Sequence, residues 1–585
     1  MTTKRLTPMD AMFLYGETPQ TMMHVGGLLP FTPAPDAPAD FLRALVREMH
    51  TETAVQRPWN MKLKTPGFLL NPAHQWVEDP DFDITYHVRR SALPHPGDER
   101  ELGILVSRLH SHPLDLTRPP WEMHLIEGLE GGRFALYVKF HHALVDGYSA
   151  IQLLNRSMSP DPSSRSEQMF FAVPPPKRDR PVSTGKSSPL ADVGAVLSRA
   201  VNVTKSVPDL AMSIVKLQLR RDGEFKHLIS SYDAPHSVLN SKIGRNRRFA
   251  TQQYDIGRLT AAAKAGGATL NDVVLAICGG GLRRFLGEQE LLGEKPLVAF
   301  LPVNVRPKGD VGGGNAVGAI LSTMGTDVED PVERLGVIAR STRQAKDQLV
   351  NLPQESILAY SALLMAPAGT QILAAMTGLK TPMPFTFNLC VSNVPGPREV
   401  LYFRGARLEA DYPVSIPIHG MALNITCQSY GGTLCFGFIG DRDALPSLQR
   451  LAVYTGEELA RLEAGLGLGA AAAGDASAPA TKAVAKASTS AASQSAAEPA
   501  ATKATAKRSA TKRSAATKSP AKRTAKPATA VAKSENSPAA AGPAAPPSKR
   551  TATAPSKRTA TPTKRTATKT ATKRTAKKTD PTDSA

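Results

Sequence analysis

Two adjacent histidines, followed at a fixed distance by an aspartate and a glycine, are the residues of this chain best suited to chemistry. The string HHALVDG occupies positions 141–147. An imidazole with a pKa of about 6.5 is largely uncharged at cytosolic pH, which is the state that a general base needs. An alcohol is a poor nucleophile unless its proton leaves as the new bond forms. We therefore expect one of the two histidines to remove a proton from a hydroxyl group.

The hydrophobic pattern before this motif distinguishes the two histidines. Apolar side chains alternate along 134–140 and should share one face of a strand: Phe134, Leu136, Val138 and Phe140. Because neighbouring residues of an extended chain point to opposite sides, His142 falls on this face and His141 on the other. We expect His142 to point into the interior between two domains and to act as the base, and His141 to support it.

Asp146 and Gly147 complete the motif. Asp146 is either a second catalytic group or a buried carboxylate that pairs with an arginine and fixes the loop. The structural role is favoured because an aspartate that precedes a glycine at the start of a helix normally organises the backbone. Gly147 suits a position that backbone or substrate approaches closely.

Regular elements should flank the motif and position it. Residues 121–140 are typical of a β-hairpin closed by Gly131-Gly132, and residues 147–158 have the pattern of a helix. The motif therefore lies at a strand-to-helix junction, where a rigid scaffold can present a side chain. Residues 246–464 again mix strands and helices. Strands separated by helices in both halves indicate a two-domain α/β (α+β) architecture.

Two segments of the second half carry specific expectations. Residues 269–287 should form a helix capped by Asn271 or Asp272. The residues between Glu355 and Lys380 are all uncharged, and their number could just span a bilayer, which takes roughly 20 residues. Because proline and glycine interrupt this run, we expect two short apolar helices in a core or a substrate channel rather than a membrane contact.

Composition divides the chain into four parts. They are a first domain with the histidine motif (1–158), a linker and crossover helical segment (159–245), a second domain (246–468) and a basic tail (469–585). The linker is rich in Pro and Ser. The basic stretch at about 190–221 is expected to be an ordinary crossover helix, although its charge would also suit an anionic lipid surface.

The tail consists almost entirely of Ala, Lys, Arg, Thr, Ser and Pro, without aromatic residues, Cys, Met, Leu or Ile. Its 23 basic and 5 acidic residues supply 18 of the chain's 20 net positive charges, so the rest of the chain is nearly neutral. The tail should be disordered because it cannot bury enough apolar surface. Tethering to an anionic surface is its favoured role, with lipid or non-specific DNA as partner, and a solubilising extension is the alternative.

Other kinds of chemistry lack their sequence signatures. The chain has no G-x-S-x-G nucleophile elbow, no G-x-x-x-x-G-K-[ST] phosphate loop and no G-x-G-x-x-G dinucleotide fingerprint. We expect no metal, because none of the cysteines has metal-ligand spacing, and we expect buried, reduced thiols at Cys278, Cys390, Cys427 and Cys435. The N-terminus lacks the apolar core of a signal peptide, so the protein is expected to be cytoplasmic and not secreted.

The histidine motif at a strand end resembles the signature of the CoA-dependent acyltransferase superfamily, which includes chloramphenicol acetyltransferases and peptide-synthetase condensation domains. Within it, most of residues 1–465 is similar to the bacterial wax ester synthase/diacylglycerol acyltransferases. The resemblance rests on seven segments: LTPMDAMFLYGETPQTMMHVGGL (6–28), RPPWEMHLIEGL (118–129), HHALVDG (141–147), TLNDVVLAICGGGLRRFL (269–286), PVNVRP (302–307), GNAVG (314–318) and NLCVSNVPGP (388–397).

The resemblance implies two chloramphenicol-acetyltransferase-like subdomains with the active site at their interface. It implies that His142 deprotonates the hydroxyl of a diacylglycerol or a fatty alcohol, and that the oxygen attacks the thioester of acyl-CoA directly. Acyl-CoA would be a co-substrate, with no permanently bound cofactor, because a thioester is already activated. Further family motifs correspond to four residues of the second half: Asn271, Asp272, Asn304 and Arg306.

Asn271 could donate a hydrogen bond to the developing oxyanion, but a helix cap is the favoured role. The family's Pro-Leu-Trp reads Pro119-Pro120-Trp121 in this chain, a change that affects local packing near the channel and leaves the base untouched.

The resemblance also implies a partner surface and leaves alternatives open. A lipid acyltransferase is expected to sit peripherally on the inner face of the membrane or on lipid droplets. The alternatives are an acyltransferase for another lipid alcohol, such as a polyketide-type ester, and a lipid-droplet or nucleoid tether that no longer turns over. The complete histidine motif argues against the tether.

Overall fold

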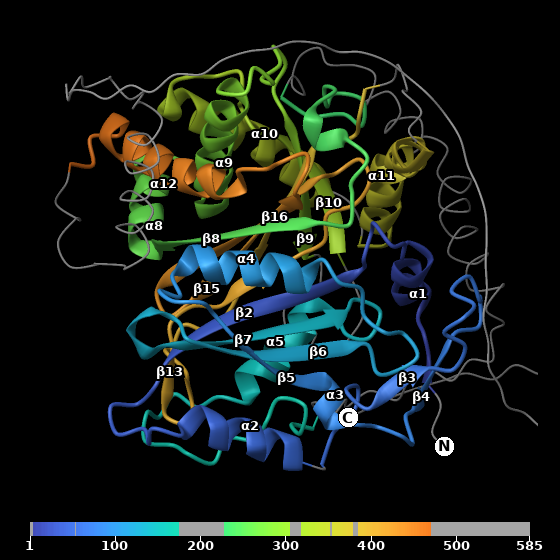
Figure 1. The fold of residues 1–585 in the computed structure, drawn as a ribbon. Coiled ribbons are helices and arrows are strands. Elements are labelled where there is room, and N and C mark those ends of the chain that lie inside the picture. Colours follow the sequence, from blue (N-terminus) through green and yellow to red (C-terminus); the bar gives the residue numbers. More distant parts are fainter. Residues whose placement is uncertain are drawn as a thin grey trace, which may run out of the picture. The chain divides into compact units, whose positions relative to one another are not determined.

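Two halves, each built around one large β-sheet, make up the described part of the chain (Figure 1). The computed structural model describes residues 4–52, 54–174, 227–304, 317–350, 354–377 and 384–469. The predicted basic helix at 190–221, Arg306 and the tail beyond Gly469 lie outside these ranges.

The first sheet carries the histidine motif at the end of a central strand. Its strands run in the order β12-β13-β2-β7-β6-β5, and β14 also pairs with β2. Their bounds are β2 (His24–Thr32), β5 (Val88–Ala92), β6 (Trp121–Glu127), β7 (Phe134–His141), β12 (Tyr402–Phe403), β13 (Ala406–Leu408) and β14 (Tyr412–Val414). β6 and β7 form the predicted antiparallel hairpin, and Gly131 and Gly132 in its turn adopt positive φ angles that suit glycine.

Helices pack on β5 and β6 of this sheet, and a separate small sheet has the strand order β1-β4-β3. The helices of this half are α1 (Pro8–Tyr15), α2 (Phe41–Thr51), α3 (Ile84–His87), α4 (Glu99–His110), η1 (Glu130–Gly132) and α5 (Gly147–Arg156). The small sheet consists of β1 (Lys4–Arg5), β3 (Met61–Leu63) and β4 (Gln75–Glu78). α5 begins at the predicted glycine, so the motif does lie at a strand-to-helix junction.

The second sheet runs in the order β10-β9-β11-β15-β16-β8. Its strands are β8 (Arg247–Asp255), β9 (Val298–Asn304), β10 (Val317–Thr323), β11 (Leu389–Val394), β15 (Leu423–Tyr430) and β16 (Thr433–Asp441). The helices of this half are η3 (Val238–Asn240), α8 (Ile256–Ala265), α9 (Leu270–Gly287), α10 (Pro331–Val350), α11 (Gln354–Thr377) and α12 (Leu448–Gly465).

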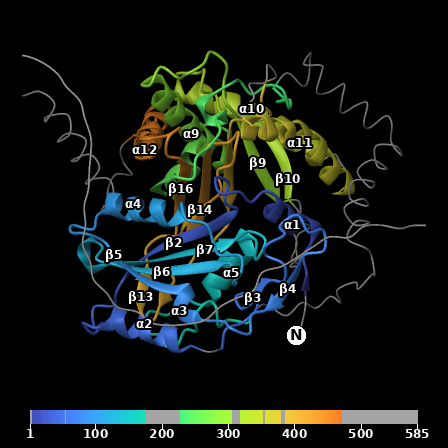
Figure 2. The ribbon, with the colours of Figure 1, turned by 45° about the vertical axis from the view of Figure 1, so that its right-hand side comes forward.

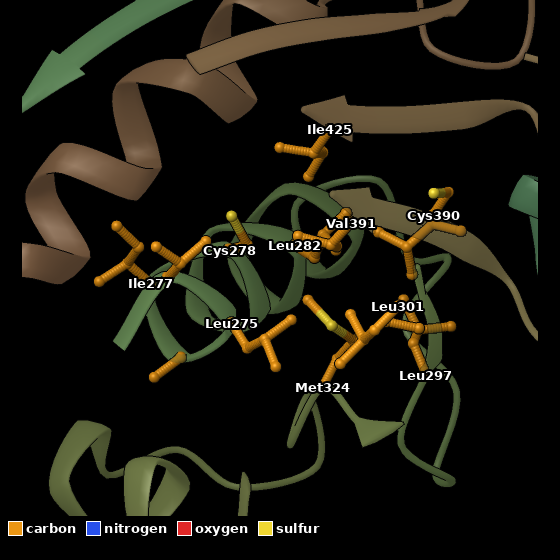
Figure 3. Packing of buried hydrophobic residues seen from close by; sticks show 14 of the residues in the cluster. Leu275, Ile277, Cys278, Leu282, Leu297, Leu301, Met324, Cys390, Val391 and Ile425 are labelled. Carbon is orange, nitrogen blue, oxygen red and sulfur yellow. The ribbon is translucent and has the colours of Figure 1, made fainter. Parts of the chain in front are cut away.

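The core of the second half forms around α9. Leu275, Cys278 and Leu282 of this helix pack in one cluster with sheet residues such as Val391 and Ile425 (Figure 3). All four cysteines of the chain are buried free thiols, as expected. Their burial in apolar surroundings raises the pKa of each thiol, and that of Cys390 rises to about 12. These cysteines are therefore packing residues and poor nucleophiles.

The two halves exchange elements, which the domain boundary at 246 does not capture. β13 and β14 come from the second half of the sequence, yet they pair with β2 of the first sheet. In return, α4 packs on β8, where the backbone N–H of Phe249 donates to Ser107 Oγ at 2.9 Å. Strands of two or three residues carry too little periodicity to be recognised in a sequence.

The segment predicted as a linker contains part of the first core. Residues 169–173 are buried, and the ring of Phe170 packs edge-on against Trp59 and Trp121. Part of the segment expected to be a linker therefore contributes to the first core. The short apolar run of these residues, MFFAV, is surrounded by Pro and Ser, whose composition dominated the prediction.

The uncharged segment of the second half forms one helix, α11, and not the two short helices expected. Pro367 lies inside it without ending it. One face, which includes Tyr360 and Leu364, is buried in the second core, as expected, whereas Leu363 is 38% exposed. Among the described residues, no single helix is long and apolar enough to cross a membrane; only α8 and α9 taken together, as a pair bent by 96°, have the length and composition.

Candidate active site

His142 directly follows the last residue of β7 and lies against α1. Its backbone N–H donates to the carbonyl oxygen of Met23 at 2.9 Å. Its ring stacks on Phe13, with 3.9 Å between the centroids and 16° between the planes. The residue is partly exposed, although its Nδ1 is buried without a hydrogen-bond partner among the described residues. The imidazole is therefore covered on one face by an aromatic ring, and the backbone that carries it is fixed by Met23.

This setting keeps the imidazole of His142 uncharged. Burial lowers the pKa of His142 to about 4, and the negative charge of Asp146 opposes this shift. At neutral pH almost every molecule therefore presents a ring that can accept a proton. The same burial weakens the ring as a base, so Asp146 preserves part of its basicity.

His141 is buried and makes different contacts. Its Nδ1 accepts a hydrogen bond from the backbone N–H of Ala143 at 3.1 Å, and its Nε2 lies 3.4 Å from Glu17 Oε2. The same carboxylate oxygen accepts the backbone N–H of Met23 at 2.5 Å. Glu17 thus connects His141 to the segment whose carbonyl group holds His142.

The two histidines do point to different surroundings, but the face argument behind this prediction is wrong in one respect. All eight residues of β7 are buried, so the alternation of apolar side chains cannot tell which face is directed toward the second half. The face of Tyr137 and Lys139, which precedes His141, packs on α4: Tyr137 Oη lies 2.7 Å from His110 Nδ1. His142 instead lies beside α1, which in both ribbon views is placed near α11 and the end of β10 (Figures 1 and 2).

Asp146 is the N-cap of α5. Its Oδ1 accepts the backbone N–H of Ser149 at 2.9 Å, and its Oδ2 accepts the Ser149 hydroxyl at 2.8 Å. The expected structural position agrees with this geometry, but the polar partner is a serine and not the expected arginine. A Cβ at Gly147 would have no described atom within 4 Å, so the space beside it is open.

The second-half residues singled out from the sequence lie in α9 and β9. Thr269 is the N-cap of α9, so the expectation of a cap at Asn271 or Asp272 is wrong. Asp272 belongs to the capping box: it accepts the backbone N–H of Thr269 at 2.8 Å and the hydroxyl of Thr342 at 2.6 Å. Asn271 is half-buried at the second helical position, and Asn304 ends β9. Among the described contacts, none joins Asn271 or Asp272 to His142.

A buried polar network between the halves could not be predicted from the sequence. His110 Nε2 lies 3.1 Å from the carbonyl oxygen of Ser415, and His24 Nε2 lies 3.0 Å from the carbonyl oxygen of His110. Because carbonyl oxygens only accept, both Nε2 atoms carry the proton, and the Tyr137 hydroxyl donates to His110 Nδ1. Burial lowers the pKa of both His24 and His110 well below 6.5. The network therefore consists of neutral imidazoles.

The first sheet receives strands from the second half of the sequence, and the histidine motif lies where its central strand β7 ends. A model of the wax ester synthase/diacylglycerol acyltransferase catalytic domain matches residues 6–274, and a model of the WS/DGAT C-terminal domain matches residues 313–463. The chain belongs to this family, which confirms the resemblance found in its sequence.

Individual relatives match more than three quarters of the chain. A putative diacylglycerol O-acyltransferase of Mycobacterium tuberculosis is 54% identical over 487 residues, which cover 79% of this chain and 98% of that protein. The O-acyltransferase WSD of Acinetobacter baylyi is 39% identical over 466 residues, 78% of this chain and 96% of that protein. The solved wax ester synthase/diacylglycerol acyltransferase from Marinobacter aquaeolei VT8 matches with a TM-score of 0.61 and 38% identity, over 79% of this chain and all of that one.

Proposed function

We propose that this protein transfers the acyl group of an acyl-CoA to the hydroxyl group of a diacylglycerol or a long-chain alcohol, with His142 as the general base. The observation that carries the proposal is the uncharged, partly exposed imidazole at the end of β7, which stacks on Phe13 while its backbone bonds the segment that Glu17 fixes. The names and the family of the relatives support acyl transfer to these two classes of alcohol.

The reaction needs one proton carrier. The imidazole accepts the proton of the hydroxyl group as its oxygen attacks the thioester carbonyl carbon. The tetrahedral intermediate then expels the CoA sulfur, and the imidazolium returns its proton to that leaving group. Ester and free CoA are the products, and the ring is restored to its neutral form. Asp146 keeps the junction in place as the cap of α5.

The substrates suggest where the enzyme works. A diacylglycerol or a long-chain alcohol resides in a lipid phase, so the enzyme would act from the cytoplasmic side of a membrane or on a lipid droplet. The basic tail would add electrostatic attraction to anionic lipid, at about 1 kcal/mol for each basic residue near the surface. Binding of the tail to DNA is the alternative.

The proposal is tested by measuring free CoA released from palmitoyl-CoA with diacylglycerol, with hexadecanol and without an acceptor. Release should depend on the acceptor, and His142→Ala should abolish the acceptor-dependent rate, whereas the exposed Leu291→Ser should not change it. Wild-type protein that binds lipid but releases no CoA with any acceptor would contradict the proposal and favour the tether.

A further inference from the structure

Three large apolar side chains extend into solvent on two neighbouring elements of the first half. Met12 on α1 is 62% exposed, and Phe68 and Leu70, in the loop between β3 and β4, are 56% and 66% exposed. No other large apolar side chain among the described residues exceeds 45%. We call these three residues the hairpin surface. α1 lies beside β3 and β4 in both views (Figures 1 and 2).

Hydrogen bonds fix the shape of this loop. Asn71 Nδ2 donates to Thr65 Oγ1 at 2.9 Å across the loop, and His74 Nε2 lies 2.8 Å from the carbonyl oxygen of Leu69. The hydroxyl of Tyr15, on α1, donates to the carbonyl oxygen of Asn71 at 3.4 Å. The exposure of the loop's apolar side chains is therefore part of a defined conformation.

The direction of the side chains alternates along the loop. Leu69 turns inward and packs against the first core, whereas Phe68 and Leu70 on either side of it point outward. Exposure of apolar side chains to water is unfavourable, and a cluster of exposed apolar side chains usually marks a contact with another apolar phase. Polar residues at positions 68 and 70 would be compatible with the inward packing of Leu69.

The charges around the hairpin surface identify that phase. Residues 61–77 include Lys62 and Lys64 and no Asp or Glu. Two further basic residues, Lys4 and Arg5, are exposed on β1, which pairs with β4. Acidic groups follow directly at Glu78 and Asp79, and each pairs with a basic side chain: Glu78 with Arg57, and Asp79 with Lys62 at 2.7 Å. Lys4 acts electrostatically on Asp10. Exposed apolar side chains flanked by basic residues are suited to a lipid surface with anionic headgroups.

We propose that the hairpin surface inserts into an anionic lipid surface and so places the α1 side of the active site against the lipid phase. This inference rests on the proposed function. α1 links the two sites: Phe13 stacks on His142, while the adjacent Met12 belongs to the hairpin surface. A diacylglycerol or a long-chain alcohol would then reach His142 along α1 without crossing water.

The test is flotation of the full chain with phosphatidylcholine vesicles that contain phosphatidylglycerol. It is done at low salt and at about 0.5 M salt, where the electrostatic attraction of the tail is screened and apolar insertion persists. Phe68→Ser/Leu70→Ser should reduce the high-salt partition at least about tenfold. The matched control Leu291→Ser changes a side chain that is 45% exposed in the second half and should bind like the wild type.

Activity measurements separate this inference from the proposed function. With a water-soluble short-chain alcohol, the double variant should release CoA at the wild-type rate, whereas with diacylglycerol in vesicles it should be slower. Equal vesicle binding by the double variant and the wild type would overturn the inference, even if the enzyme is active. A dimer that the double substitution dissociates without lipid would also overturn it, in favour of a second copy as the partner.

Discussion

The ring of Phe13 lies flat against the imidazole of His142, with 3.9 Å between their centroids. Phe13 comes from α1, near the N-terminus, and His142 from the end of β7, so this contact depends on the pairing of β2 with β7. In that pairing His24 opposes His141 directly. An apolar ring on one face both orients the imidazole and removes water from it. Orientation and low pKa of the base therefore have a common physical origin.

Phe13→Ala should remove both effects at once. Water should reach the imidazole, so the apparent pKa of the acidic limb of kcat/KM should move from about 4 toward 6.5. The released ring should lower acceptor-dependent kcat about tenfold. The pH profile of CoA release measures both quantities. Phe13→Leu keeps the apolar bulk and should leave the acidic limb near its wild-type position; an unshifted limb in Phe13→Ala would contradict the argument.

The neutral histidines between the halves predict that the protein loses stability in acid. The pKa of His24 and of His110 is lower in the folded state than in the unfolded chain, so below pH 6.5 the unfolded chain binds more protons. The free energy of unfolding should therefore fall as the pH decreases from about 6.5, by about 1.4 kcal/mol per pH unit for each such histidine. Asp411, whose pKa burial raises to about 7, acts with the opposite sign.

Urea unfolding at pH 7.5 and pH 5.5, each about one unit from the ordinary histidine pKa, measures this difference. His110→Gln should lower stability at pH 7.5, because the contacts with Ser415 and Tyr137 are disturbed, but it should reduce the loss between the two pH values. A variant that loses as much stability in acid as the wild type would show that another group controls the transition.

Glu17 should act as a positioning residue. Its carboxylate accepts the backbone N–H of Met23, whose carbonyl group in turn holds the backbone of His142. Glu17→Ala should lower kcat about tenfold with little change in KM. Glu17→Gln retains an acceptor oxygen and should remain within about threefold of the wild type. Equal losses in both variants would mean that the charge beside His141, and not the hydrogen bond, is what matters.

The sequence was informative wherever the signal was local. Alternation and a Gly-Gly turn predicted the hairpin of β6 and β7, and the aspartate before Gly147 predicted an organised helix start. The choice of His142 over His141 rested on a local argument too, and it required knowledge of what covers each face of β7. Because both faces of β7 are buried, only the tertiary structure shows which elements cover each face.

The parts that the sequence could not show depend on long-range pairing. Glu17 and Phe13 lie within a segment that contributed to the family resemblance, but only the register of β2 against β7 brings them to the histidines. Strands as short as β13 and the apolar run at 169–173 give too few residues for a periodic pattern. Asn271 remains assigned through the family resemblance alone.

Asp146 offers the sharpest separation of structure from catalysis within the motif. As the N-cap of α5 it bonds both the backbone and the hydroxyl of Ser149. Asp146→Ala should therefore lower the free energy of unfolding by about 1 kcal/mol. Asp146→Asn keeps a capping oxygen and should be nearly as stable as the wild type.

The charge of Asp146 has a second effect, because it opposes the lowering of the pKa of His142. Without that charge the imidazole becomes a weaker base, so Asp146→Asn should show a modest loss of kcat, about threefold to tenfold, with a folded and stable protein. Thermal unfolding and CoA release measured on the same samples test this. If Asp146→Asn loses activity as completely as His142→Ala while remaining stable, the carboxylate takes part in the reaction itself, because neither the cap nor a small change in base strength accounts for such a loss.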